Sequence, residues 1–383
     1  MIPPYRARSG GRAVWKKAAP ASLAVVLLFL VLPPVSPTLA AQEPSGFPPE
    51  LAASLQESDG ELVLRAYQHS YPDKISGVAW RDGDWTITAG GEIFYWAGGR
   101  LLPHALLGEA ESWVPHVYDY YPSRAPSPQI YSPRYIESLR RQGEAESSDR
   151  DGRYRGFQGK LYGGLSRKEV ETRLQRIRFL GRNVTVHRDI VQALGRVEAS
   201  VNRIAAEDQK IADFAASLGQ IGAYNWREIR GTTRSSRGIT EEADTRLSYH
   251  SWGLALDILS REIPSNKAVY WLWERARNPD WMLIPLENRW APPEELIRAF
   301  ENEGFIWGGK WGLYDNMHFE YRPELHEINR LLAARQGLSP GGETGGIRAG
   351  ERAGRDLHHV YPRDLEKTRR IPGLGELFKG FFK

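Results

Sequence analysis

Cysteine is absent from the 383 residues of this chain, and that absence limits how the fold can be held together. Disulfides, thiolate metal sites and a cysteine nucleophile are all excluded. Stability must therefore come from an ordinary apolar core. Apolar residues make up 41% of the sequence and charged residues 26%, which suits a globular protein of about two domains. Any metal must be bound by histidine, aspartate or glutamate.

The first 41 residues have the order of a secretory signal. A basic stretch precedes an apolar run from Ala21 to Leu32, which is followed by prolines and by small residues up to Ala41. The apolar run is shorter than the roughly 20 residues that span a bilayer. We therefore expect an exported protein of the periplasm or cell envelope, and the alternative is an N-terminal anchor that is retained.

The net charge of +4 comes from this N-terminal stretch. Five of the 51 basic residues lie before the first acidic residue, Glu43, so the rest of the chain has 46 basic residues against 47 acidic ones. A nearly neutral chain does not have the basic surface that nucleic-acid binding requires. We expect no nucleic-acid partner, and the oligomeric state is left open.

Changes in composition divide the chain into segments. Polar residues with proline, serine and glutamate indicate linkers, and a shift to glycine, arginine and glutamate indicates disorder. We expect this order: a signal at 1–41, a linker at 42–60, a β-rich segment of unknown role at 61–135, a linker at 136–165, a main domain at 166–335 and a mostly disordered tail at 336–383.

Turn signals and apolar spacing predict the elements within these segments. Asp82-Gly83-Asp84 and Gly90-Gly91 separate short β-like runs as hairpin turns do. Ser166 and Glu169 fit a capping box, and apolar residues then recur at helical spacing up to Leu180. A second helical pattern runs over residues 190–218. A third begins at Pro292-Pro293-Glu294-Glu295 and ends at Gly304.

The last residues of the chain combine phenylalanines and leucines at helical spacing with two lysines. The apolar positions are Leu374, Leu377, Phe378, Phe381 and Phe382. A short amphipathic segment of this kind would make weak contact with a membrane or a partner. The alternative is a terminal helix that docks on its own domain.

The stretch SYHSWGLALDI at residues 248–258 predicts a strand with two different faces. One face is apolar: Leu254, Leu256 and Ile258. The other face carries only small residues and Asp257, which leaves space around the carboxylate. His250 is an odd number of residues from Asp257, so a flat strand would separate them. Gly253 can supply the bend that brings both side chains to one point.

The stretch WGGKWGLYDNMHFEY at residues 307–321 adds a second imidazole and a second carboxylate. Asp315 and His318 are three residues apart and lie on one side of a tight loop or helical turn. Catalytic zinc takes three protein ligands and leaves one position for water, so we assign His250, Asp257 and His318 as ligands and Asp315 as general base. A structural site with all four residues as ligands is the alternative. The same ligands also suit iron or manganese.

Four arginines lie just before the first of these stretches: Arg227, Arg230, Arg234 and Arg237. An arginine can hold a substrate carboxylate or stabilise an oxyanion, whereas a solvated basic loop is the plainer interpretation for most of the four.

The pattern Ser-x-His-x-x-Gly-x-Ala-x-Asp followed by Asp-x-x-His-Phe-Glu resembles the M15 family of zinc metallopeptidases, over roughly residues 185–335. The resemblance implies a hedgehog-type α+β metallopeptidase fold, with a small antiparallel sheet flanked by helices, beside the smaller β-rich N-terminal segment. It implies Zn²⁺ on His250, Asp257 and His318, with Asp315 as catalytic base. Arg227 matches the substrate-binding arginine, for which Arg234 and Arg237 are alternatives, and Ser248 would bind substrate or orient the loop.

The activity that the resemblance implies is hydrolysis of peptidoglycan stem peptides. Many carboxypeptidases and dipeptidases of the family have Glu at the base position, whereas this chain has Asp315. That residue and the Trp-Gly-Gly stretch are closer to the L-Ala–D-Glu endopeptidases than to the D-Ala–D-Ala carboxypeptidases. The alternative function is that of a non-catalytic peptidoglycan-binding protein that retains the peptidase fold.

Overall fold

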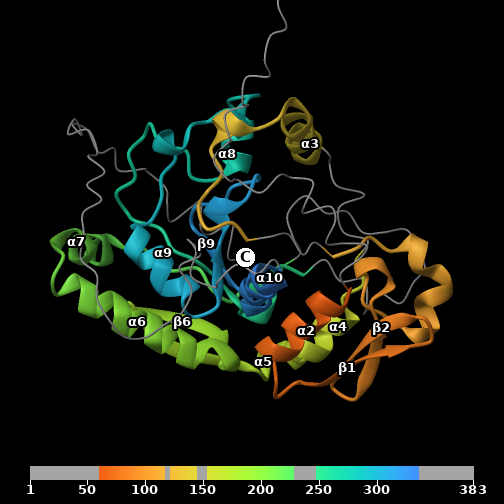
Figure 1. Ribbon diagram of the computed structural model, residues 1–383. Coiled ribbons are helices and arrows are strands. Elements are labelled where there is room, and N and C mark those ends of the chain that lie inside the picture. The colour runs from red at the N-terminus through yellow and green to blue at the C-terminus, as the bar shows by residue number, and fades with distance from the viewer. Residues whose placement is uncertain (1–59, 117–120, 145–152, 228–246, 336–383) are drawn as a thin grey trace, which may run out of the picture. The chain divides into compact units, whose positions relative to one another are not determined.

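The computed structural model describes residues 60–116, 121–144, 153–227 and 247–335 (Figure 1). All of them belong to the compact unit Gly46–Lys383. The expected signal at 1–41 and the expected tail at 336–383 lie outside these residues and stay predictions. Among the helices of the described part, none is long and apolar enough to cross a membrane.

Helices and short strands alternate along the described chain. The α-helices are α2 (Gly60–Ser70), α3 (Pro133–Glu144), α4 (Gly156–Tyr162), α5 (Arg167–Glu171), α6 (Val191–Ala205), α7 (Gln209–Ser217), α8 (Trp271–Arg275), α9 (Glu294–Glu301) and α10 (Pro323–Arg335). The strands are β1 (Ile75–Arg81), β2 (Asp84–Ala89), β3 (Glu92–Tyr95), β4 (Leu102–Pro103), β5 (Leu174–Phe179), β6 (Arg182–His187), β7 (Ala255–Asp257), β8 (Phe305–Trp307) and β9 (His318–Tyr321).

Short 3₁₀ helices connect these elements. They are η1 (Ala97–Gly99), η2 (His104–Ser112), η3 (Pro128–Ile130), η4 (Arg188–Ile190), η5 (Tyr249–Trp252), η6 (Trp281–Leu283), η7 (Leu286–Asn288) and η8 (Gly308–Lys310).

The strands form three separate antiparallel sheets. The first has the order β1-β2-β3-β4, the second is the pair β5-β6, and the third has the order β7-β9-β8. Strand β9, which begins with His318, is therefore the central strand of the third sheet and lies next to β7, which ends with Asp257. Helices with small antiparallel sheets confirm the expected α+β class.

The first sheet has the two hairpin turns that the sequence predicts. Arg81 pairs with Asp84 across Asp82-Gly83, and Ala89 pairs with Glu92 across Gly90-Gly91. All four central residues have positive φ, between 51° and 85°. Two-residue hairpins favour this conformation because its twist matches the strands, and glycine adopts it without strain.

The helix expected from Ser166 to Leu180 is wrong beyond its first turns. The capping box of Ser166 and Glu169 is present and starts α5, but α5 ends at Glu171 and residues 174–179 form β5. The hairpin turn Leu180-Gly181 then leads into β6. The apolar spacing in this segment fits a helix as well as a strand, and pairing with β6 decides between them.

The linker expected at residues 136–165 also differs from the structure. This range contains most of α3 and all of α4. Phe157, Leu161 and Tyr162 of α4 are each at most 2% exposed and pack in the main core. The glycines of this segment gave it the composition of a linker, but its aromatic side chains are buried.

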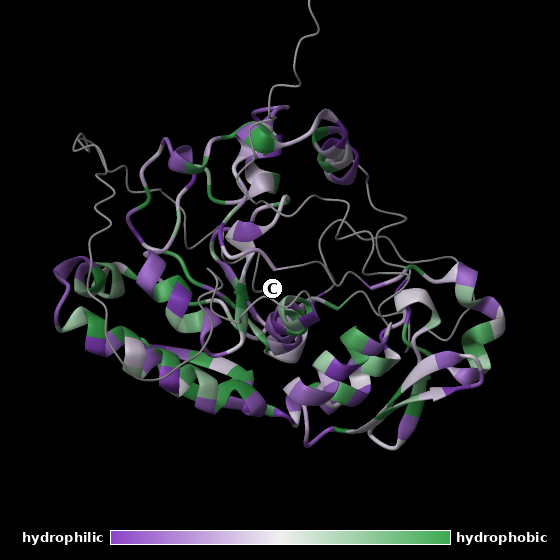
Figure 2. Cartoon of the chain, viewed as in Figure 1, coloured by the Kyte–Doolittle hydropathy of each residue, from purple (hydrophilic) through white to green (hydrophobic). Residues whose placement is uncertain are grey.

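The main hydrophobic core combines the N-terminal and C-terminal parts of the described chain. Val63 and Tyr67 of α2 belong to the same cluster as Phe300 of α9 and Phe319 of β9. Helix α6 buries one face, which consists of Ala193, Leu194, Val197 and Val201. Figure 2 shows α6 as a mixture of hydrophobic and hydrophilic residues, as expected for a helix that packs on one side only.

Candidate metal centre

The 3₁₀ turn η5, which Ser248 caps, positions His250 close to the third sheet. The hydroxyl of Ser248 accepts a hydrogen bond from the backbone N–H of His250 at 3.3 Å and caps η5. Gly253 ends η5 with a φ of +67°, and a Cβ at this position would lie 2.8 Å from the backbone nitrogen of His187. Only glycine fits this conformation and this approach without strain. The bend expected at Gly253 is therefore present.

Strand pairing brings Asp257 and His318 together. Asp257 ends β7 and pairs directly with His318 at the start of β9. Because residues opposite each other in an antiparallel pair project their side chains on the same face, the carboxylate and the imidazole are neighbours. Leu254 and Leu256, on the other face of β7, belong to the main core, as the sequence predicts.

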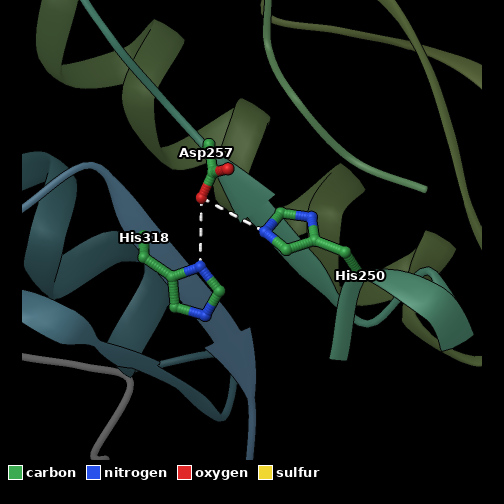
Figure 3. Close-up of side chains that lie close together, drawn as sticks. All are labelled: His250, Asp257 and His318. Carbon is green, nitrogen blue, oxygen red and sulfur yellow. Dashed lines mark hydrogen bonds and ion pairs between the residues drawn. The ribbon is translucent and has the colours of Figure 1, made fainter. Parts of the chain in front are cut away.

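The three side chains converge on one carboxylate oxygen. His250 Nε2 lies 3.2 Å and His318 Nδ1 lies 3.0 Å from Oδ1 of Asp257. Figure 3 shows both rings directed at this oxygen. One ligand atom from each residue lies within 4.8 Å of the others, and all three residues are buried. This spacing suits a single metal ion bound by all three.

The remaining ring nitrogen of each histidine is occupied by a protein acceptor. His250 Nδ1 lies 2.6 Å from the carbonyl oxygen of Ala223. His318 Nε2 lies 3.2 Å from Oε2 of Glu320. A ring N–H donated to such an acceptor leaves the lone pair of the other nitrogen free for a metal, and it orients the ring. The spacing of the three side chains suits a metal ion, and so does the tautomer of each histidine, because Nε2 of His250 and Nδ1 of His318 can serve as ligands.

The protonation states of Asp257 and His318 depend on each other. Burial opposes ionisation of Asp257, but the charges and hydrogen bonds of His250 and His318 hold its pKa well below its usual range. Burial lowers the pKa of His318, yet Asp257 and Glu320 raise it to about 10. A histidine between two carboxylates carries a proton that a metal ion would replace.

Asp315 lies in the loop between η8 and β9. Its backbone N–H donates to the carbonyl of Gly308 at 3.0 Å, and its own carbonyl accepts from the N–H of His318 at 3.1 Å. A Cβ at Gly308 would lie 2.6 Å from the carbonyl oxygen of Asp315, so glycine is needed for this approach. These backbone hydrogen bonds hold Asp315 next to His318, one of the three potential metal ligands.

Asp315 is partly buried, and its carboxylate interacts electrostatically with Asp257 and His318. Its Oδ1 has no hydrogen-bond partner among the residues described. Burial and the charge of Asp257 raise its pKa to about 7, while His318 and Arg227 lower it. Asp315 is not among the residues whose ligand atoms lie within 4.8 Å of one another. The group of potential metal ligands therefore consists of the other three residues.

Arg227 is tied to the His250 turn through its backbone. Its N–H donates to the Ser251 hydroxyl at 2.9 Å, and its carbonyl accepts from the N–H of Ser248 at 3.1 Å. The charge of its guanidinium is among the influences that lower the pKa of Asp315. Arg234 and Arg237, the alternatives for the substrate-binding arginine, lie outside the residues described.

Sequence reasoning missed the residues that support the ligands. Glu320 is two residues after His318 on β9, and this spacing on a strand was the signal that it shares a face with the ligand. Trp311 packs beside the site, with its ring centroid 5.4 Å from that of His318. The acceptor role of the Ala223 carbonyl has no signal in the sequence, because any residue has such an oxygen.

Comparison with known proteins gives two matches to family models. Residues 63–118 match a domain of unknown function, DUF8518. No curated protein and no solved structure matches the chain. Residues 242–321 match a family model of the M15 peptidases described as D-alanyl-D-alanine carboxypeptidase, and this range includes His250, Asp257, Asp315 and His318. The segment that carries the candidate metal centre is therefore similar to the M15 peptidases, and the match supports a peptidase.

Proposed function

We propose that this protein is an exported zinc peptidase that hydrolyses the stem peptides of peptidoglycan. One observation carries the proposal. His250 and His318 each direct one ring nitrogen at Asp257 and hold the other on a protein acceptor, while Oδ1 of Asp315 has no hydrogen-bond partner among the residues described. A catalytic site needs such a free base next to an open metal position.

Two imidazole nitrogens and one carboxylate are a usual ligand set of catalytic zinc. A zinc ion held by His250, Asp257 and His318 would lower the pKa of a water molecule and polarise the carbonyl under attack. Iron and manganese accept the same ligands, so the metal content of the purified protein is the first thing to measure.

Asp315 is the proposed general base. It takes a proton from the attacking water and passes it to the nitrogen of the leaving amine, so that no net proton remains on the carboxylate. A pKa raised to about 7 by burial suits a group that must both accept and release a proton near neutral pH. The unpaired Oδ1 is free to receive the hydrogen bond of the water.

Arg227 is the proposed anchor for a substrate carboxylate. Stem peptides carry carboxylates at D-Glu and at the terminal D-Ala, and a guanidinium binds a carboxylate with two parallel hydrogen bonds. The cleaved bond is either D-Ala–D-Ala or L-Ala–D-Glu. The aspartate at position 315 favours the second, as argued from the sequence.

The test is a digest of purified peptidoglycan, with added zinc and with a chelator, read by mass spectrometry. Loss of a terminal D-Ala that the chelator stops would establish a carboxypeptidase. Release of peptides that begin at D-Glu would establish an endopeptidase. Asp315→Asn should slow formation of either product about 10²–10⁴-fold, whereas Asp280→Asn, at an exposed position, serves as a matched control and should not.

The absence of any chelator-sensitive product would refute the peptidase proposal. Saturable binding to sacculi without cleavage would then support the wall-binding alternative. Export is tested separately by expression of the full chain in a bacterial host, followed by mass spectrometry of the N-terminus of the envelope fraction. A mature protein that begins near residue 42 is expected, and a chain retained in the cytoplasm would contradict it.

A further inference from the structure

A largely buried arginine contacts the carboxylate that supports His318 and the residue that precedes His250. Arg322 Nη1 lies 3.2 Å from Oε1 of Glu320, whose other oxygen lies 3.2 Å from His318 Nε2. The guanidinium of Arg322 also lies 5.0 Å from the ring centroid of Tyr249, the residue before His250. One side chain thus contacts the support of His318 on β9 and the ring of Tyr249 in η5, next to His250.

A second carboxylate neutralises Arg322 from the other side. Nε of Arg322 donates to Oε1 of Glu324, in the first turn of α10. The second oxygen of Glu324 accepts a hydrogen bond at 3.0 Å from the hydroxyl of Tyr71, immediately after α2. The carboxylates of Glu320 and Glu324 therefore both pair with the guanidinium of Arg322. The hydroxyl of Tyr71 donates a hydrogen bond to the carboxylate of Glu324.

This chain of contacts is buried along its length. Glu320 is 7% exposed, Glu324 is 0% exposed and the side chain of Arg322 is 11% exposed. Buried charges are tolerated only when each has a partner in good geometry. Removal of Arg322 would leave Glu324 without its cation, and Glu320 would lose the contact that fixes its orientation toward His318.

We propose that Arg322 is a positioning residue of the metal centre, and that Tyr71 and Glu324 hold it in place. The inference rests on the proposed metal site but not on the peptidase activity. Because Tyr71 lies in residues 63–118, the segment that matches the domain of unknown function contributes a side chain to the support of the metal ligands.

The packing of the two helices agrees with this role. Helix α2 packs against α10, as Figure 1 shows, and His69 Nδ1 lies 2.7 Å from Oε1 of Glu327 in α10. The N-terminal segment and the helix that carries Glu324 thus share a core and polar contacts. We infer that the metal centre requires both segments to reach its full affinity.

The experiment compares the zinc affinity of full-length variants by competition with a chromophoric chelator. Substitution of groups that orient metal ligands typically costs about 10–100-fold in metal affinity. We expect Arg322→Met to weaken zinc binding in this range and Tyr71→Phe to weaken it by a smaller factor of about two to five. The visible spectrum of the Co²⁺-loaded protein should change in both variants, because it reports the ligand geometry.

A matched control separates this role from general stability. Arg298→Met removes an arginine–carboxylate pair with Glu294 within α9, where both side chains are largely exposed. This variant should keep the zinc affinity and the Co²⁺ spectrum of the wild-type protein. If Arg322→Met does not fold, the charge-balanced double variant Arg322→Met/Glu324→Gln replaces it.

The two readouts decide the inference. In the double variant the melting temperature should recover while zinc binding stays weak, because Glu320 still lacks its contact with the guanidinium. Zinc affinity and Co²⁺ spectra equal to wild type in Tyr71→Phe and in the folded Arg322 variant would overturn the proposal. A protein that binds zinc with the expected dependence on Arg322 but cleaves nothing would refute only the proposed function.

Discussion

The bend at Gly253 allows a quantitative test of how the metal centre is assembled. Its φ of +67° costs a residue with a Cβ roughly 1–2 kcal/mol. The new Cβ of Gly253→Ala would also lie 2.8 Å from the backbone nitrogen of His187 and 2.8 Å from Cδ2 of Leu174. The first of these atoms cannot easily move, because the His187 N–H donates to the Gly253 carbonyl at 2.9 Å.

Overpacking of a buried site typically costs about 1–3 kcal/mol, so Gly253→Ala should lower the free energy of unfolding by about 2–5 kcal/mol in all. The assay is urea denaturation in the presence of a chelator, which removes the contribution of bound metal. The change should also move His250 away from Asp257 and weaken zinc binding. These two measurements are independent of substrate.

Gly195→Ala is the matched control. Gly195 lies inside α6, and a Cβ there would have no atom within 4 Å. Alanine is the better helix former, so this variant should gain about 0.5–1 kcal/mol. A Gly253→Ala protein as stable as the wild type would refute the argument, since the positive φ and the close approach would then have no cost.

The other predictions concern the proposed base, the proton balance and the metal. Asp315→Asn should lower kcat about 10²–10⁴-fold with zinc still bound, and wild-type turnover would contradict its role. Although burial lowers the pKa of His318, Asp257 and Glu320 raise it to about 10 in the metal-free protein. Zinc should therefore displace a proton, and its affinity should rise about tenfold per pH unit between about pH 7 and 9. Calorimetry in two buffers counts the protons, and a count of zero would contradict this. In the metal-free protein, the raised pKa of His318 contributes to the free energy of unfolding. This contribution is fully present below about pH 6.5 and is lost as the pH rises through about 10, and chemical denaturation at several pH values measures it. Zinc at about 100 times its Kd should stabilise the wild-type protein by about 2.7 kcal/mol, and no shift in melting would contradict a site in the folded state.

Local signals predicted the elements that depend on local chemistry. The turns at Asp82-Gly83 and Gly90-Gly91 are where the glycines indicated them, because positive φ is a property of the residue itself. The helix that begins at Glu294 and the capping box at Ser166 were also predicted, because helix starts depend on proline position and on side-chain caps within one turn. Each of these features is decided within a few residues.

The same reasoning was wrong where distant parts of the chain compete. Leu174 and Ile177 have helical spacing, yet β5 forms because its backbone pairs with β6. The segment at 156–162 has the composition of a linker, yet Phe157 is buried. Its ring contacts Tyr67 of α2 and Phe94 of β3. Spacing and composition alone do not contain these contacts.

The sequence by itself determined the chemistry of the candidate site. His250, Asp257, Asp315 and His318 could be selected from residue type and spacing, and Gly253 indicated the bend, because a metal site needs particular side chains in a particular order.

Only the tertiary structure decided which ring nitrogen of each histidine faces Asp257, since the Ala223 carbonyl and Glu320 occupy the other. It also decided that Tyr71 supports the site, through a hydrogen bond to a residue 253 positions away in the chain. Contacts of that kind come from the packing of α2 against α10, and packing has no local signal.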